Sequence, residues 1–453
     1  MRMMDVRATL KGMKTFLVKR HTGAFRRLYR QITQTQWYTQ AQLEAFQLEQ
    51  LQRLVRHAWE TVPYYRRVME EHGIRPDDIR QLDDIRRFPI MSKDDLKKAG
   101  EEIVSTRYRR SLLSTAHTGG TTGLPVPVRR DPWSIAREHA FVKRQFDWAG
   151  VRASDRCAYL EGRTVVPPGQ KPVSYHYYDA VMRELTLSTF HLTPDVIPHY
   201  VQLMKAYRIV ALIAYPSAAY VLAKGCLDRK LSLKLHCVLT TSETLDEVKK
   251  KTISEAFGCP VFDFYGSAER VCYIHMCEQG SYHVIPEYGL TELIPAGAPN
   301  EDCCQVVSTG FWSLTMPLIR YNMRDLVKVS GRTCGCGRAF TVVDRIIGRD
   351  GNVIVTPSGL RLGASAIECI LARILYAMYD MPIVAGRVVQ EAGDVLTLEY
   401  VPDAGFNDEH VERLRAVMAE QMPTGMRAEL RALREIDRTS RGKFVSFAMA
   451  EHH

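Results

Sequence analysis

The 453-residue sequence has no apolar run long enough to cross a bilayer. Its longest uncharged apolar stretch, residues 209–223, contains Pro216 and lies between Arg208 and Lys224, which predicts a buried strand followed by a helix. The first ten residues lack the apolar core and small-residue cleavage site of a secretory signal. Internal repeats and low-complexity tracts are also absent. These absences favour a soluble globular protein, and the length favours two or three domains.

No repeated framework organises the cysteines, and their number, eleven, is odd. A disulfide-rich secreted scaffold is therefore not expected. Without an export signal, a reducing compartment, the cytoplasm, is predicted.

Acidic residues are scarce near the amino terminus, where residues 2–30 hold nine Lys or Arg and one acid, Asp5, in a chain of net charge +10. A basic helix on an anionic membrane surface is one interpretation. An extended, solvated basic arm is the favoured one. Nucleic-acid binding is not expected, because neither an aromatic-basic motif nor zinc-finger spacing is present.

The pattern of apolar residues predicts an α/β fold. Residues 1–109 are expected to form a helical region of the large domain, with Ser92 capping a helix. Residues 110–348 are expected to form its core, with mostly parallel sheets and outer helices. Residues 349–453 are expected to form a small α+β domain. Expected core strands are 157–161, 209–215, 236–240, 261–265 and 306–309, and expected helices are 134–149, 194–207, 218–230 and 246–257. In the small domain, helices are expected at 364–378 and 407–421, and strands near 383–390, 395–401 and 429–436.

The sharpest local motif is a Gly- and hydroxyl-rich loop at residues 114–125. Its glycines let backbone N–H groups approach an anion, and its hydroxyls add uncharged donors. It is neither a Walker A loop nor a Rossmann fingerprint. A flexible turn is the competing interpretation. The expected phosphate-binding residues are Ser114, Thr118, Gly119, Gly120, Thr121, Thr122 and Gly123.

This loop resembles the phosphate loop of the adenylate-forming enzymes, the acyl-CoA synthetase and adenylation-domain superfamily. The chain is similar to the phenylacetate-CoA ligase branch and its capsule-biosynthesis relatives from about residue 51 to 447. Residues 62–65 and 88–93 also resemble this branch. The family's lysine before the loop proline is Leu124 here.

The resemblance implies roles for residues near 242 and 265. In the sequence Tyr265-Gly266-Ser267-Ala268-Glu269, the tyrosine would stack on adenine and Glu269 would bind Mg²⁺. Ser242 and Glu243 would line the adenine site. Gly266 and Ser267 would complete the nucleotide site.

Further along the chain, the resemblance implies that Asp325 accepts hydrogen bonds from the ribose hydroxyls. Met323-Arg324 replaces the Thr-Gly that the family has before this aspartate. Arg349 would reach the nucleotide, and Asp350 would be the hinge before the small domain. Lys443 would bridge the acid and the α-phosphate during adenylation.

The implied function is activation of a carboxylic acid by ATP, with pyrophosphate release, followed by acyl transfer to coenzyme A. Transfer to an amine or carrier protein is an alternative, and a non-catalytic assembly protein is another. A homodimer also stays open. The acid pocket is expected from residues 133–148, 159–164, 215–219 and 265–267, whose aromatics suggest an aryl acid.

Four residues outside this set suggest a structural Zn²⁺ site. Three thiols and an imidazole are a tetrahedral zinc set, and some relatives in the branch carry such a zinc. The expected ligands are Cys277, His283, Cys334 and Cys336. Ordinary buried cysteines are the competing interpretation.

Overall fold

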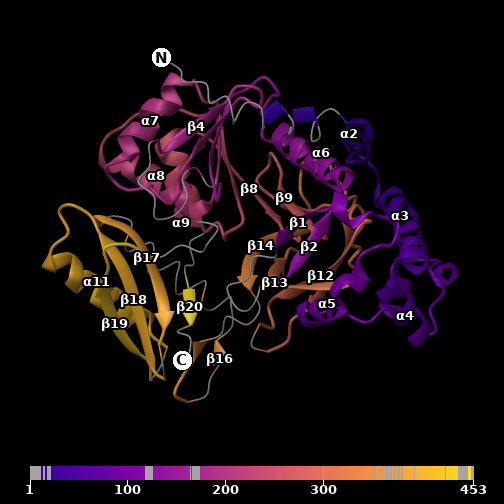
Figure 1. Cartoon of the computed structure of the whole chain (residues 1–453). Coiled ribbons are helices and arrows are strands. Elements are labelled where there is room, and N and C mark those ends of the chain that lie inside the picture. Colours follow the sequence, from indigo (N-terminus) through magenta and orange to yellow (C-terminus); the bar gives the residue numbers. More distant parts are fainter. Residues whose placement is uncertain are drawn as a thin grey trace.

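The computed structural model describes residues 12–13, 16–17, 22–117, 126–163, 165, 174–298, 300–349, 354–358, 361–362, 367, 370, 374, 378, 381–391, 393–423, 425–436 and 447–449. It is a mixed α/β structure built on one large sheet, with a separate four-stranded sheet near the C-terminus (Figure 1). Among the described residues, no helix is both long and apolar enough to cross a membrane.

The amino-terminal region is helical, as predicted. Its helices are α2 (Gly23–Thr35), α3 (Gln40–Thr61), α4 (Pro63–Glu71) and α5 (Lys93–Ala99). Ser92 caps α5, since its side chain accepts a hydrogen bond from the Asp95 backbone N–H at 3.1 Å. The predicted helix cap is therefore confirmed.

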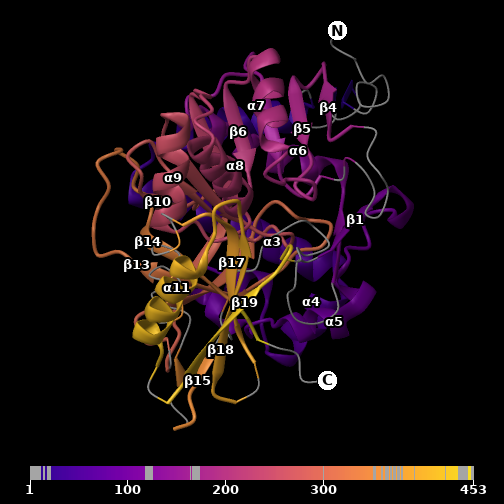
Figure 2. The same ribbon diagram turned by 90° about the vertical axis from the view of Figure 1, so that its left-hand side faces the viewer.

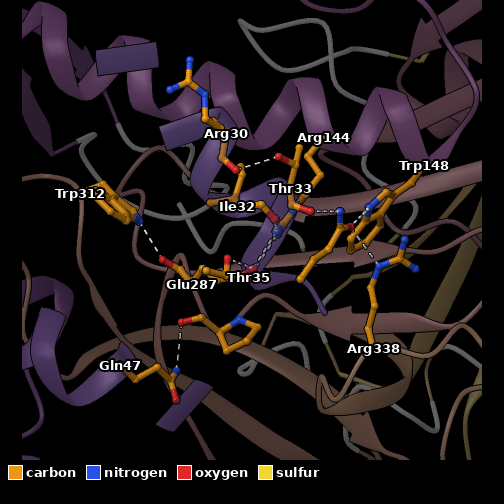
Figure 3. A network of polar contacts seen from close by, with 12 residues as sticks. Arg30, Ile32, Thr33, Thr35, Gln47, Arg144, Trp148, Glu287, Trp312 and Arg338 are labelled. Carbon is orange, nitrogen blue, oxygen red and sulfur yellow. Dashed lines mark hydrogen bonds and ion pairs between the residues drawn. The ribbon is translucent and has the colours of Figure 1, made fainter. Parts of the chain in front are cut away.

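A buried ion pair fastens α2 to α6 (Pro132–Trp148). Arg144, 1% exposed, donates to Glu287 Oε1 at 2.7 Å and to the carbonyl of Ile32 at 2.9 Å (Figure 3). Thr35 donates to the same carboxylate oxygen at 3.0 Å. Removing one partner would leave a buried charge uncompensated, so the pair fixes where α2 sits.

The large sheet has twelve strands in the order β11-β12-β13-β14-β10-β9-β8-β7-β6-β3-β5-β4. Neighbouring strands are parallel only from β5 through β3, β6 and β7 to β8, and the other pairs are antiparallel. The α/β fold class is confirmed, whereas the expected parallel pairing holds for only this part. The strands are β3 (Cys157–Leu160), β4 (His176–Asp179), β5 (Glu184–Leu187), β6 (Ala211–Ala214), β7 (Cys237–Thr241), β8 (Val261–Gly266), β9 (Tyr273–Met276), β10 (Tyr282–Val284), β11 (Gly289–Pro295), β12 (Cys304–Gly310), β13 (Tyr321–Val329) and β14 (Val342–Arg349).

Helices alternate with the parallel strands as the sequence predicted. They are α6, α7 (Ile197–Ala206), α8 (Pro216–Asp228) and α9 (Glu247–Phe257). The apolar stretch at 209–223 forms β6 and the first half of α8, and Pro216 occupies the first turn of that helix, where its missing N–H costs nothing. Two short strands, β1 (Ser114–His117) and β2 (Pro127–Arg130), pair as a separate antiparallel hairpin.

The C-terminal sheet has the order β19-β18-β17-β20. Its strands are β17 (Ile383–Gln390), β18 (Val395–Pro402), β19 (Arg427–Ala432) and β20 (Phe447–Met449), with α11 (Asp408–Gln421); β15 (Ile354–Val355) and β16 (Arg361–Leu362) form a separate pair. Most of the helix predicted at 364–378 lies outside the described residues. The sheet lies near α8 and α9 (Figure 2), where Arg229 pairs with Asp403 at 3.6 Å.

Candidate active site

Four of the predicted nucleotide-binding residues lie where two parallel strands end. Ser242 and Glu243 follow β7, and Tyr265 and Gly266 end β8, its parallel neighbour. Adjacent parallel strands present their carboxyl ends at one sheet edge, which is where open α/β sheets bind ligands. Asp325 and Arg349 reach the site from the antiparallel strands β13 and β14, where they are paired in register.

Asp325 lies at the centre of this site and is buried. The Tyr265 hydroxyl donates to Oδ2 of Asp325 at 2.6 Å, and Arg349 Nε pairs with Oδ1 at 3.1 Å. The negative charge of Asp325 raises the pKa of Arg349. Burial raises the pKa of Tyr265 well above its usual value, and Asp325 adds to this shift. Asp325 thus contacts two other residues that are expected to bind the same nucleotide.

Glu269 is buried on the turn after β8. The Tyr321 hydroxyl donates to its Oε1 at 3.3 Å, and burial, followed by the charge of Glu269, raises the pKa of Tyr321. A buried carboxylate beside the nucleotide residues offers the hard oxygen ligand that Mg²⁺ prefers.

Lys93 adds a positive charge near the Glu269 carboxylate. No role for this lysine was predicted from the sequence. Partial burial lowers its pKa, with further lowering from Lys97 and Arg349 and an opposing effect from Glu269. Two residues earlier, the Met91 N–H donates to the Arg320 carbonyl, and the Met91 carbonyl accepts from the Asn322 N–H, each at 2.9 Å. These bonds form a parallel bridge between Met91 and Tyr321. This long-range pairing brings the start of α5 to the site.

Glu243, predicted to line the adenine site, also contacts the start of α8. The backbone N–H of Ser217 donates to its Oε2 at 3.0 Å, so the carboxylate caps the first turn of α8. Ser242 has a φ of 72°, which a non-glycine residue adopts only at a sharp turn. The loop after β7 is therefore tightly bent beside the site.

Gly266 is required by packing. It pairs in register with Tyr273, and a Cβ at Gly266 would overlap the tyrosine ring. The glycine of this motif thus allows the β9 ring to lie against the end of β8. Ser267 follows on the turn, with its hydroxyl 4.0 Å from Met323 Sδ.

Of the residues predicted to bind phosphate in the loop, Ser114 alone lies in the described part of the chain. Ser114 lies at the open end of the β1–β2 hairpin, where its hydroxyl donates to the Arg130 carbonyl at 3.2 Å. The loop tip and the carboxyl-terminal motif lie outside the described residues, including Thr118, Gly119, Gly120, Thr121, Thr122, Gly123, Asp350 and Lys443.

The four predicted zinc ligands converge. The donor atoms of Cys277, His283, Cys334 and Cys336 all lie within 4.8 Å of one another. Cys277 Sγ is 3.6 Å from Cys334 Sγ, and Cys336 Sγ is 3.4 Å from His283 Nε2. Three sulfurs and one imidazole nitrogen this close together suit a tetrahedral Zn²⁺.

Buried contacts hold the loop that carries two of these thiols. Arg338 stacks over Trp148 at 4.1 Å and over Trp37 at 4.8 Å. Its Nη1 also pairs with Glu278, next to Cys277, at 2.9 Å. The cluster is therefore tied to α6 and to the end of α2.

Comparisons with known proteins show what the chain is similar to. No family model matches the chain. It is 26% identical to the phenylacetate-coenzyme A ligase of Thermus thermophilus over 76% of this chain and 78% of that protein. It is 23% identical to protein CapK of Staphylococcus aureus over 64% of each chain.

Solved structures share the fold. A 2-hydroxyisobutyryl-CoA ligase in its postadenylation state matches with a TM-score of 0.66 at 21% identity, covering 91% of this chain and 90% of that one. The same ligase in its thioesterification state, with coenzyme A, gives 0.56. The chain has the fold of the adenylate-forming acyl-CoA ligases and is a distant relative of the phenylacetate-CoA ligases and CapK.

Proposed function

We propose that this protein uses ATP to activate a carboxylic acid as an acyl-adenylate, releasing pyrophosphate, and then transfers the acyl group to coenzyme A. The observation that carries the proposal is the meeting of Tyr265, Asp325 and Arg349 from three strands, beside Glu269. The similarity to proteins named phenylacetate-coenzyme A ligase supports coenzyme A as the acceptor.

Asp325 is the proposed ribose ligand. A carboxylate can accept several hydrogen bonds, and Arg349 and Tyr265 already orient both of its oxygens. The ribose hydroxyls would add to these contacts at remaining lone pairs. Arg349 is then positioned to contact the nucleotide while it keeps Asp325 fixed.

Glu269 is the proposed ligand of the Mg²⁺ that accompanies the nucleotide, and the ion would neutralise phosphate charge. The Tyr321 hydroxyl orients that carboxylate. Lys93 supplies a nearby positive charge from α5. These groups concentrate opposite charges where a polyphosphate would lie.

The remaining roles rest on the resemblance. The residues of the loop, Ser114 through Gly123, are proposed to hold the phosphates, Lys443 to stabilise charge at the α-phosphate, and Asp350 to act as the hinge. Ser242 and Glu243 are proposed to line the adenine site.

The thiol and imidazole cluster is proposed to hold a structural Zn²⁺, because the donor set and the spacing of the donor atoms both fit. The ion would cross-link the end of β9, β10 and the loop before β14. No disulfide joins the ten described cysteines, which fits the proposed cytoplasmic location.

The test is a screen of pyrophosphate release from ATP and Mg²⁺ over a broad panel of carboxylic acids. Chromatography of the same reactions with coenzyme A should reveal a thioester. Acid-dependent pyrophosphate release is expected for at least one acid class. If ATP turnover were independent of every acid, the enzyme would not be an acid ligase.

A further inference from the structure

His275, on β9, is a completely buried imidazole that makes no hydrogen bond with the described part of the chain. Its exposure is 0%, and neither ring nitrogen has a partner among the described residues. Each ring nitrogen of an imidazole can take part in a hydrogen bond, so the ring has two unused hydrogen-bonding positions. Buried polar groups in folded proteins are nearly always paired, so this side chain requires an explanation.

Among the described residues, a third unpaired polar atom belongs to Gln145, whose amide contacts the backbone of Met276, the residue after His275. Gln145, on α6, is buried, and its amide nitrogen donates to the carbonyl of Met276 at 3.1 Å. This bond fixes the orientation of the amide and leaves Oε1 without a partner. Neighbouring side chains of α6 and β9 thus present three unpaired polar atoms.

Aromatic rings surround the imidazole. The ring centroid of His275 lies 4.8 Å from Tyr273, 5.9 Å from Trp148 and 6.0 Å from Phe264. These rings come from β9, α6 and β8. The surroundings are mostly flat and apolar, although the buried Arg144 guanidinium also lies over the Trp148 ring, at 5.2 Å. A mostly apolar lining with a few polar groups is the usual composition of a small-molecule site.

The aromatic cluster adjoins the proposed active site. Phe264 is partly exposed and immediately precedes Tyr265, and Tyr273 packs against Gly266. The cluster lies between α6 and the end of β8, two of the segments expected to line the acid pocket. A substrate whose carboxyl group faced the nucleotide could extend toward His275 after small side-chain movements.

We propose that His275 and Gln145 form the polar end of the acid pocket and select an aromatic acid that carries a hydroxyl group remote from its carboxyl. A hydroxyl both donates and accepts, so it can pair with a ring nitrogen of His275 or with the Gln145 oxygen. The stacked rings suit an aromatic ring. This inference rests on the proposed function and adds the substrate class.

The test compares His275→Leu, His275→Phe and Gln145→Leu with the wild type. Pyrophosphate release is measured with benzoate and phenylacetate and with their ring-hydroxylated isomers. The wild type should prefer at least one hydroxylated isomer. Each variant should lower the ratio of kcat/KM for that isomer over its unsubstituted parent by about tenfold or more, because a site built to bind a hydroxyl rejects the analogue without one.

His57 provides the matched control, since it is also buried but its Nε2 lies 2.8 Å from the Leu314 carbonyl. His57→Phe should keep the wild-type acid ratio and lower the melting temperature. His275→Leu or His275→Phe should raise the melting temperature of the ligand-free protein, because an unpaired polar group is removed.

The two proposals fail in different ways. If the wild type releases pyrophosphate but the His275 and Gln145 variants keep its acid preference, the substrate assignment is wrong. A lower melting temperature for both His275 variants with an unchanged preference would make His275 a structural residue. If no acid supports pyrophosphate release by the wild type, the proposed function itself fails.

Discussion

The hydroxyl of Tyr265 donates a 2.6 Å hydrogen bond to the carboxylate of Asp325, which joins the end of β8 to β13. By resemblance, the first residue stacks on adenine and the second binds ribose. The bond couples the two subsites, because moving the phenol also changes the orientation of the carboxylate. Arg349, on the other carboxylate oxygen, completes the arrangement.

Asp325→Ala should lower kcat/KM for ATP by about 10- to 100-fold. Hydrogen bonds to a charged group contribute about 1.5–3 kcal/mol, and each 1.4 kcal/mol is a factor of ten. Tyr265→Phe keeps the ring and removes only the bond to Asp325, so its effect should be smaller than tenfold. Initial rates of pyrophosphate release at varied ATP provide the measurement. Equal losses in the two variants would contradict the assignment of ribose binding to Asp325.

Glu269→Gln should raise the Mg²⁺ concentration needed for half-maximal activity, because a neutral amide is a poorer ligand for a hard cation. Tyr321→Phe, which removes the hydroxyl on Glu269 Oε1, is the matched variant and should shift the Mg²⁺ requirement less. Mg²⁺ titrations at fixed ATP measure both. An unchanged Mg²⁺ dependence in Glu269→Gln would show that another group holds the ion.

Cys336→Ser should reduce bound zinc, measured by plasma mass spectrometry, and lower the melting temperature, because metal binding contributes folding free energy. Cys226→Ser is the control, since this thiol is buried but lies outside the cluster. Zinc at one equivalent in the wild type and in the control is expected. Wild-type protein that folds without any metal would contradict the proposed zinc site.

The stability of the protein should also depend on pH through Asp263. This carboxyl is buried between Thr240 and Tyr282, and burial raises its pKa from 3.8 to about 6. Because the folded pKa lies above the unfolded one, the folded state binds the proton more tightly, and stability falls as the pH rises from about 4 to 6. The contribution is about 3 kcal/mol.

Urea denaturation of the wild type and Asp263→Asn at pH 4.5 and pH 7 measures this effect. The wild type should lose more stability than the variant between the two pH values. Identical pH dependence in both proteins would show that Asp263 has the same proton affinity folded and unfolded.

Much of the parallel half of the sheet could be predicted, because each buried strand is a short apolar run between helices. The antiparallel half was harder to predict from the sequence, since strands such as β11 and β13 mix buried and more exposed residues. The start of α6 at Pro132, two residues earlier than predicted, reflects capping by Asp131, whose side chain accepts from the Trp133 and Ser134 N–H groups.

The residues of the proposed active site were likewise only partly predictable from the sequence. The resemblance assigned Tyr265, Asp325 and Arg349 to one nucleotide site, and in the structure Asp325 contacts each of the other two. Tyr321 and Lys93 were missed as site residues, although both stand in motifs that resemble the family. Their positions depend on the pairing of Met91 with Tyr321, which no local pattern reveals. Likewise, only the fold shows that Glu243 caps α8.

Acid-dependent exchange of labelled pyrophosphate into ATP tests the central claim most directly, since it requires reversible formation of an acyl-adenylate. The wild type should catalyse this exchange with its preferred acid and without coenzyme A. Lys443→Ala should reduce the exchange by about 100-fold or more, because the lysine is proposed to stabilise charge in that step. Thioester formation by the wild type in the absence of any such exchange would contradict an adenylate intermediate.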